Sequence, residues 1–331
     1  MPLELIVAGV MLVALNFFAL SGGADYGGGV WDLFARGPRA KAQRALIAGA
    51  IGPVWEANHV WMILVVVVLF TGFPVAFAAI ATALHIPLTL VLIGIVLRGA
   101  AFTFRSYDSQ RDHVQRRWSY VFSISSLITP VLLGVTVGAL SAGAIRVDHG
   151  VVTTGFFQWV ARFPFAVGVF ALVLFAFLAA VYLALEASDV ELKEDFRRRA
   201  LIAGVCVGVM ALVVFLLASS DAPKVRAGLS ASVFALPLHG ATALCAVGAF
   251  ATLWLRKYAA ARIFAALQVS LILWGWALAQ YPCIVAPDVT IESAAAPAAT
   301  LRFLVLALAS GAVLLFPSLY YLMKVFKGKP I

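Results

Sequence analysis

The chain has 331 residues, of which 63% are hydrophobic and 12% are charged, and its formal net charge is +9. A soluble domain keeps about a quarter of its residues charged, so this composition excludes an ordinary soluble enzyme. The basic residues lie in short loops between apolar segments, which argues against a nucleic-acid-binding surface and is typical of a membrane protein. The apolar segments are long and do not alternate with polar residues, so they are expected to be helices.

Nine apolar segments are long enough to cross a bilayer, so we predict an all-α polytopic membrane protein. The predicted spans are 3–22, 52–71, 74–97, 118–141, 160–186, 200–219, 233–254, 263–281 and 301–323. Pro74 marks the nearly loop-free connection between the second and third spans. The segment 187–199 separates an earlier from a later group of helices, which could belong to two bundles.

The distribution of basic residues predicts the orientation of the chain. Most of the 24 Lys and Arg residues lie in every second connection, and cytoplasmic loops carry such an excess. These connections are 23–50, 98–117, 187–199, 255–262 and the segment after 323. We therefore expect the N-terminus outside, the C-terminus in the cytoplasm, and the first apolar segment to be a retained span.

The first predicted span ends in a glycine-rich run from Gly22 to Gly29 that contains Asp25. Glycines at this density allow either the close approach of another helix or a break in the helix. Asp25 is expected near the cytoplasmic end of the span. There it would either hydrogen-bond to the helix terminus and loop or take part in proton transfer.

The second predicted span begins with the most polar segment of any span, residues 51–61. Glu56 and His59 are three residues apart and share one helix face, and Asn58 and Trp61 form a second pair of this kind. An ionisable residue within a span indicates a functional role, here proton or ion transfer, because its burial is costly. The structural alternative is that Glu56 complements the dipole at the helix start or reaches headgroup water.

Two arginines, Arg98 and Arg105, follow the third predicted span and flank a stretch of small and aromatic residues. One interpretation is a basic stop signal that keeps this end in the cytoplasm. The other is that they pair with an anion, either a lipid phosphate or an acid on a partner subunit.

Metal and catalytic sites have little support in the sequence. His85 lies in the middle of the third predicted span, where it could ligate haem iron, but no second His is expected at the same depth. A hydrogen bond between helices is the alternative role for His85. The three cysteines have no metal-ligand spacing, and the sequence contains no nucleophile elbow, phosphate loop or CxxCH motif. The chain alone therefore offers no complete catalytic site.

Several stretches, in order from about residue 20 to 328, together resemble subunit II of cytochrome bd-type quinol oxidases. The most specific is the Gly-Pro-x-Trp-acid-x-Asn-x-x-Trp pattern that runs from Gly52 to Trp61. The others are Asp25-Tyr26-Gly27, Leu97-Arg98-Gly99, Phe104-Arg105-Ser106, the stretch from Trp274 to Pro282, and Lys324-Val325-Phe326-Lys327-Gly328.

The resemblance implies two four-helix bundles, residues 1–142 and 160–281, with a ninth helix at 301–323. It implies a heterodimer in the bacterial inner membrane with a subunit I of the same fold. That partner would hold the quinol oxidation site and the haems, two b-type and one d-type or b-type. This chain would hold no haem and no catalytic residue. The resemblance leaves open a quinone bound in this chain and a small third subunit.

The resemblance also implies roles for individual residues. Glu56, His59 and Asp25 would line a cytoplasmic proton path for the reduction of dioxygen to water. Structural or interface roles would fall to Trp55, Asn58, Trp61, Arg98 and Arg105.

The chain departs from the family pattern at some of these same residues and next to them. The family often has Asp-Gly-Phe-Asp where this chain has Gly22-Gly23-Ala24-Asp25, and Asp where it has Glu56. It often has Gln or Glu where this chain has His59. These changes suggest a divergent branch, such as the cyanide-insensitive type.

Two other functions compete with the oxidase subunit. A proton-coupled small-solute transporter would require paired broken helices near the midplane, and only one glycine-rich break is apparent. A haem-bearing electron carrier would require paired intramembrane histidines.

Overall fold

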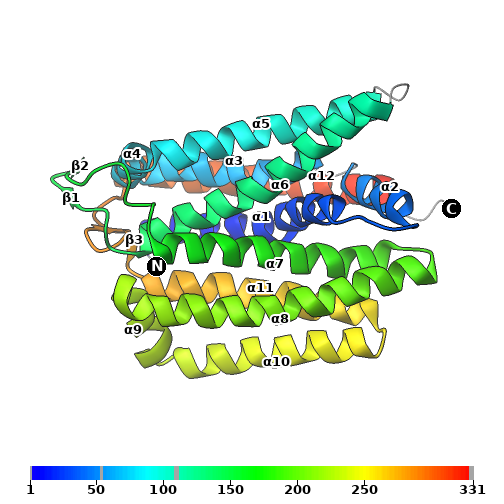
Figure 1. Cartoon of the computed structure of the whole chain (residues 1–331). Coiled ribbons are helices and arrows are strands. Elements are labelled where there is room, and N and C mark those ends of the chain that lie inside the picture. Colours follow the sequence, from blue (N-terminus) through cyan, green and yellow to red (C-terminus); the bar gives the residue numbers. More distant parts are fainter. Residues whose placement is uncertain (1, 53–54, 108–111, 328–331) are drawn as a thin grey trace.

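Long helices run side by side, and short helices and two hairpins close one end (Figure 1). The structure is a computed structural model that describes residues 2–52, 55–107 and 112–327. The helices are α1 (Leu3–Leu33), α2 (Ala40–Ile51), α3 (Trp55–Gly72), α4 (Pro74–Ala83), α5 (His85–Tyr107), α6 (Asp112–Ser141), α7 (Arg162–Glu186), α8 (Val190–Asp221), α9 (Pro223–Ala231), α10 (Ala235–Trp254), α11 (Tyr258–Gln280) and α12 (Ala298–Lys327).

The number of membrane spans agrees with the sequence. In the described part of the chain, 8 helices are long and apolar enough to cross a membrane. The segments Asn58–Gly72 and Pro74–Ala83 form a bent pair with an angle of 117° between them, and counting this pair as one span gives up to 9. The prediction of an all-α polytopic membrane protein is therefore confirmed.

The two ends of the helices differ in chemistry. The connections after α1, α7 and α10 and the C-terminal ends of α5 and α12 lie together on the right of Figure 1, which we call the basic end. The opposite end, which we call the hairpin end, carries the N-terminus, α4, α9 and the hairpins (Figure 1). Connections that carry most of the Lys and Arg residues thus gather at one end of the molecule, as the alternation in the sequence predicts.

The hairpins at the hairpin end are joined to each other. Strand β1 (Val147–Asp148) pairs antiparallel with β2 (Val151–Val152), and β3 (Cys283–Val285) pairs antiparallel with β4 (Val289–Thr290). Asp288 accepts hydrogen bonds from Arg146 Nε at 2.7 Å and from the backbone N–H of Val147 at 2.9 Å. One carboxylate therefore ties the two hairpins together across the ends of the helices.

The first helix is longer than predicted, because the glycine-rich run is helical to Leu33. A Cβ at Gly27 would collide with the carbonyl oxygen of Phe175 on α7, and one at Gly29 would collide with Ser126 on α6. The glycines therefore permit close helix approach and do not break the helix. The predicted 23–50 loop is wrong in this respect, since it contains the end of α1 and all but one residue of α2.

The third predicted span, 74–97, is wrong in its first half. Helix α4 ends at Ala83 and α5 begins at His85, because a helix continuing through this point would bring the ring of Pro87 against the carbonyl of Ala83. The break places Pro87 in the first turn of α5, where proline is tolerated. His85 is therefore exposed at the hairpin end and not in the middle of a span.

The remaining predicted spans correspond to α6, α7, α8, α10, α11 and α12. Several of these helices continue beyond the apolar segment into the polar connections. Helix α8, for example, begins at Val190, and Asp189 caps its start with a side-chain oxygen that accepts from the N–H of Glu191. The predicted 220–232 loop contains α9.

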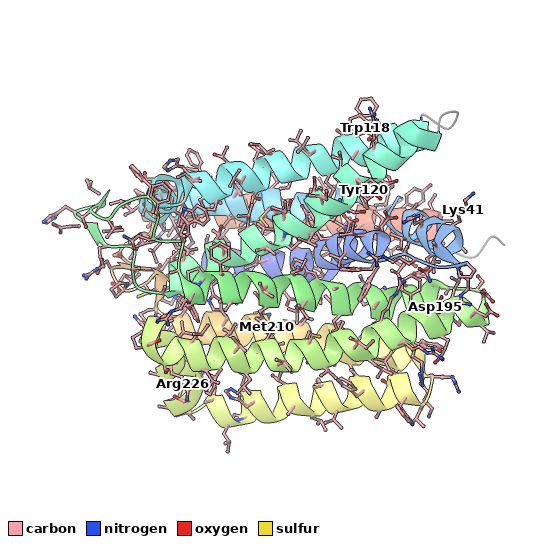
Figure 2. All side chains as sticks on the ribbon, in the orientation of Figure 1. Lys41, Trp118, Tyr120, Asp195, Met210 and Arg226 are labelled. Carbon is pink, nitrogen blue, oxygen red and sulfur yellow. The ribbon has the colours of Figure 1, made fainter. Side chains whose placement is uncertain are left out.

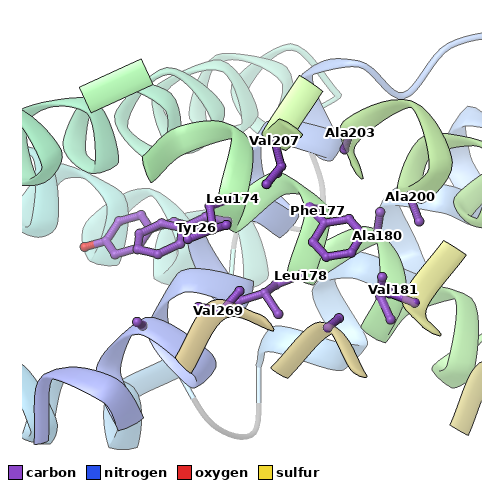
Figure 3. Close-up of a cluster of buried hydrophobic side chains, with 14 of the residues drawn as sticks. Tyr26, Leu174, Phe177, Leu178, Ala180, Val181, Ala200, Ala203, Val207 and Val269 are labelled. Carbon is purple, nitrogen blue, oxygen red and sulfur yellow. The ribbon is translucent and has the colours of Figure 1, made fainter. Parts of the chain in front are cut away.

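The main core lies where α7 packs between α1, α8 and α11. Figure 3 shows this cluster, which includes Tyr26 of α1, Leu174, Phe177, Leu178, Ala180 and Val181 of α7, Ala200, Ala203 and Val207 of α8, and Val269 of α11. Helix α12 is in contrast the least buried of the candidate spans among the described residues. Exposed leucines and phenylalanines on such a helix are expected to face lipid or another apolar chain.

The earlier and later groups of helices meet at α6 and α7. A Cβ at Gly134 would collide with Gly168, and one at Gly138 would collide with Pro164, so small residues set a close approach here. A second link joins α6 to α11, where Ser141 Oγ donates to Gln280 Oε1 at 2.5 Å and accepts from Trp276 Nε1 at 2.8 Å. The division into bundles at 1–142 and 160–281 stays a prediction.

Candidate functional site

A buried ion pair joins α1 to α5. Arg98 Nη2 lies 2.5 Å from Asp25 Oδ1 and 3.3 Å from the carbonyl oxygen of Asp25. Only 1% of Arg98 and 4% of Asp25 are exposed. A charge this deeply buried is costly unless an opposite charge and hydrogen bonds compensate it, and each member of this pair compensates the other.

The remaining contacts of Arg98 fix its guanidinium in place. Its Nε donates to Ser126 Oγ of α6 at 3.0 Å. The guanidinium lies 4.8 Å from the ring centroid of Tyr26 and 4.9 Å from that of Phe122, which are cation–π distances. Three helices thus hold one arginine, and α1 comes close enough to α6 because residue 29 is glycine.

Several polar atoms around this pair keep unused hydrogen-bonding capacity. Asp25 Oδ2, Tyr26 OH and Thr129 Oγ1 are buried, and no described residue hydrogen-bonds to any of them. The ring of Tyr26 also packs edge-on against His59 of α3, with centroids 6.2 Å apart. Buried polar atoms normally have a partner, so these atoms mark a place where a proton donor or acceptor can be accommodated.

A second buried carboxylate lies on α1 between Asp25 and the basic end. We call Asp25, Asp32 and Ser123 together the polar line. Asp32 follows Asp25 by seven positions on α1, which places both on one helix face, and it is 2% exposed. Its Oδ2 accepts a hydrogen bond from Ser123 Oγ at 3.0 Å, and Ser123 precedes Ser126 by three positions on α6. We did not single out Asp32 from the sequence, although its seven-residue spacing from Asp25 was a usable signal.

The predicted site residues fall into two groups. The structure brings Asp25, Arg98 and His59 together, with Tyr26 between the first and the last. Asp25 lies about two turns before the end of α1 at Leu33, and Arg98 pairs with an acid of its own chain.

Two further predicted residues of α3, Asn58 and Trp61, pack inward. Trp61 is 8% exposed and its ring stacks on Phe17 of α1 at 4.6 Å, while Asn58 is 5% exposed. The side chains of the other predicted residues, Trp55, Glu56 and Arg105, lie outside the described part of the structure. Helix α3 begins at Trp55, so the backbone of residue 56 lies in its first turn, three positions before His59.

No group of three or more His, Cys, Asp or Glu side chains that could hold a metal ion occurs among the described residues. The histidines that could be expected to bind haem iron make local contacts. His85 Nδ1 lies 2.9 Å from the carbonyl oxygen of Thr82, and His239 Nδ1 lies 2.6 Å from that of Ala235. His85 is the first residue of α5 and His239 lies in the second turn of α10, so both are near the hairpin end.

The fold and the site define a polytopic helical membrane protein whose interior carries a fixed ion pair and further unpaired polar atoms. Comparison with known proteins identifies the family. The chain belongs to the cytochrome bd terminal oxidase subunit II family, whose model matches residues 3–326. The resemblance noted in the sequence is confirmed, and the transporter alternative receives no support.

Two characterised relatives illustrate the similarity. The chain is 33% identical over 136 residues to the cytochrome bd ubiquinol oxidase subunit 2 of Bacillus subtilis, covering 40% of this chain. It is 29% identical over 182 residues to the cytochrome bd-I ubiquinol oxidase subunit 2 of Escherichia coli, covering 54% of this chain. These alignments span 38% and 46% of the two relatives' own lengths.

A solved structure shares the whole fold. The bd oxidase from Geobacillus thermodenitrificans contains a chain that superposes with a TM-score of 0.83 at 20% identity. The superposition covers 98% of this chain and 99% of that one. At this identity the likeness establishes the fold alone.

Proposed function

We propose that this chain is the non-haem subunit II of a cytochrome bd-type quinol:oxygen oxidoreductase in a bacterial inner membrane. Its support is the family membership and the activity for which the two relatives are named, since both are ubiquinol oxidase subunits. In this proposal the haems and the quinol oxidation site belong to a partner subunit I, and the enzyme is the complex.

The structural role of the chain follows from its exposed apolar surface. Helices α10 and α12 present apolar faces that bilayer or partner helices would cover, with Val247 at 66% and Val313 at 72% exposed. Stabilisation of the haem-bearing partner is thus the first role that we assign to this chain. We assign it neither a bound quinone nor a contact with a small third subunit.

The second role is a contribution to the proton path. Reduction of dioxygen to water consumes protons, and these must cross a low-dielectric interior on groups that can bind them. Asp25 carries the proposal: Arg98 holds one of its oxygens, and no described residue bonds to the other. His59 reaches the same neighbourhood through Tyr26. We place Glu56 on this path because it precedes His59 by three positions on α3.

The polar line gives the proposed path a direction. Asp32 and Ser123 lie between Asp25 and the basic end of α1. If the basic end faces the cytoplasm, protons enter from that side and the N-terminus lies outside. The fixed charge of Arg98 would then stabilise a negative charge on Asp25, while a group such as His59 exchanges the proton.

The test is purification from native membranes through an affinity tag on this chain. We expect a second, haem-containing chain to co-purify, with a reduced-minus-oxidised haem spectrum and quinol-dependent oxygen consumption. The same chain expressed without its partner should show no stoichiometric haem. One haem per isolated chain, or a native complex without haem, would contradict the proposed function.

A further inference from the structure

A second polar feature lies at the basic end, between the α1–α2 connection and the first turns of α8. It is a pocket of about 320 Å³. Figure 2 shows Asp195, which lines this pocket, and Lys41, which does not, at the same end of the helices. The charged and amide residues that line the pocket are Arg36, Arg39, Arg198, Arg199, Asp195 and Gln43.

One arginine of the pocket is committed to the protein itself. Arg39 Nε and Nη2 donate to the two carboxylate oxygens of Asp195 at 2.8 and 2.7 Å, and Nη1 donates to Glu191 at 2.9 Å. The hydrogen bonds that Arg39 donates to Asp195 raise the pKa of Arg39 above its usual value. Arg39 therefore stays charged and paired with Asp195 at this side of the pocket. The pair fixes the loop before α2 against α8 and shapes the pocket.

Arg199 is also held in place, but it is not satisfied. Its Nη2 donates to Gln43 Oε1 at 2.7 Å, and its guanidinium lies 5.3 Å from the ring centroid of Trp31 and 5.0 Å from that of Phe196. Its Nη1 is buried, and no described residue accepts a hydrogen bond from it. The guanidinium is thus preorganised and carries more donors than the chain uses.

The positive charge of the pocket exceeds its negative charge. Arg36 is exposed and makes no ion pair with any described residue, and Arg198 makes only a 3.4 Å contact with Glu194. Asp195 is the acid among the described lining residues, and Arg39 already neutralises it. A planar guanidinium binds phosphate oxygens with two donors at once, and the exposed Arg36 is free to do this, while Arg199 adds a fixed positive charge beside it.

We propose that this pocket binds a phosphate group, with Arg36 as its principal donor and Arg199 as a fixed positive charge in its wall. The group could belong to an anionic phospholipid headgroup or be inorganic phosphate, and both sources present the same oxygens. Its place at the basic ends of the spans favours the lipid, because headgroups lie at this level and basic pockets between helices attract them. The exposed ring of Phe34 at the pocket edge could contact the acyl region.

The test uses the complete complex in detergent, titrated in parallel with phosphatidylglycerol and with inorganic phosphate. Bound lipid is counted by native mass spectrometry, and the thermal midpoint is measured in both arms. Arg36→Gln removes an exposed donor without disturbing the core, and Arg199→Gln removes the stacked one. Lys41→Gln is the matched control, since Lys41 is an exposed cation at the same end that does not line the pocket.

We expect one tightly bound anionic lipid in the wild type and in Lys41→Gln. In Arg36→Gln its affinity should fall roughly fivefold to tenfold, as expected for one lost cation at the membrane surface. Stabilisation by lipid alone identifies a headgroup site, and stabilisation by both ligands identifies a general phosphate site. Equal lipid binding in Arg36→Gln, Lys41→Gln and wild type, or no effect of either ligand, would overturn the proposal.

Discussion

Arg98 Nη2 lies 2.5 Å from Asp25 Oδ1, although the two residues are 73 positions apart and belong to different helices. Both side chains are almost completely buried. The pair therefore fixes the relative position of α1 and α5 and leaves a charged group inside the part of the chain that crosses the membrane.

Breaking the pair from one side should be costly. Asp25→Asn or Arg98→Gln leaves one buried charge without its partner, which typically costs about 3–5 kcal/mol. We expect a lower thermal midpoint and lower yield of the assembled complex from either variant. The double variant Asp25→Asn/Arg98→Gln should be less damaged than the sum of the two. Strict additivity would show that the two side chains do not interact.

Close packing of α1 on α7 should depend on residue 27. A methyl group at Gly27 would meet the carbonyl oxygen of Phe175, so Gly27→Ala should destabilise the chain by about 1–3 kcal/mol. Gly9 lies on the same helix with nothing within 4 Å of an added Cβ, so Gly9→Ala is the matched control and should be harmless. The measurement is the thermal midpoint of the complex that carries each variant. An equal fall of the midpoint in Gly27→Ala and Gly9→Ala would refute the packing argument.

The link between the hairpins should respond to acid. Hydrogen bonds from Arg146 hold the pKa of Asp288 below its usual value. A depressed pKa in the folded state means that the stabilisation is present above the unfolded pKa, about 3.9, and is lost as pH falls through the folded value. Protection of residues 146–148 against hydrogen exchange, measured relative to the intrinsic rate at each pH, should therefore stay high near neutral pH and fall only in acid.

Asp288→Asn should make this exchange fast already at neutral pH and remove its acid dependence. Asp148→Asn is the control, because Asp148 is an exposed acid in the β1–β2 hairpin, whose exchange is measured. An unchanged exchange profile in Asp288→Asn would show that the carboxylate does not hold the hairpins together.

The orientation can be tested with reporters. We expect a fluorescent protein fused after Lys327 to fold in the cytoplasm, and a phosphatase fused in the 147–152 hairpin to be active outside. The physical reason is the clustering of basic loops at the end opposite the hairpins. The reverse pattern of activity would require the proposed direction of the proton path to be inverted.

Hydrophobic length and the alternation of basic loops were sufficient to predict the class of fold and the number of spans. They could not predict the continuation of α1 through Gly22–Gly29, because glycine is a poor helix former and only the packing against Phe175 and Ser126 explains it. The break before His85 was likewise hidden inside one apolar run, although Pro87 was a usable signal.

The sequence predicted which residues belong to the site, but it did not predict that they lie next to one another. The candidates were polar groups in or beside a predicted span, and they included Asp25, His59 and Arg98. Their meeting depends on the approach of α1, α3 and α5, which no local pattern encodes. Arg98 consequently has its partner in the same chain, where the sequence suggested a lipid or another subunit.

The central claim is that this chain supplies part of the proton path of an oxidase, and Glu56 is the residue to change. The most direct measurement is quinol-dependent oxygen consumption per haem in the purified complex. Glu56→Gln should keep assembly and haem content but slow turnover, because the amide cannot carry a proton, and Glu56→Asp should be tolerated because it keeps the acid. Wild-type turnover in an assembled Glu56→Gln complex would contradict the claim and leave Glu56 a structural role at the start of α3.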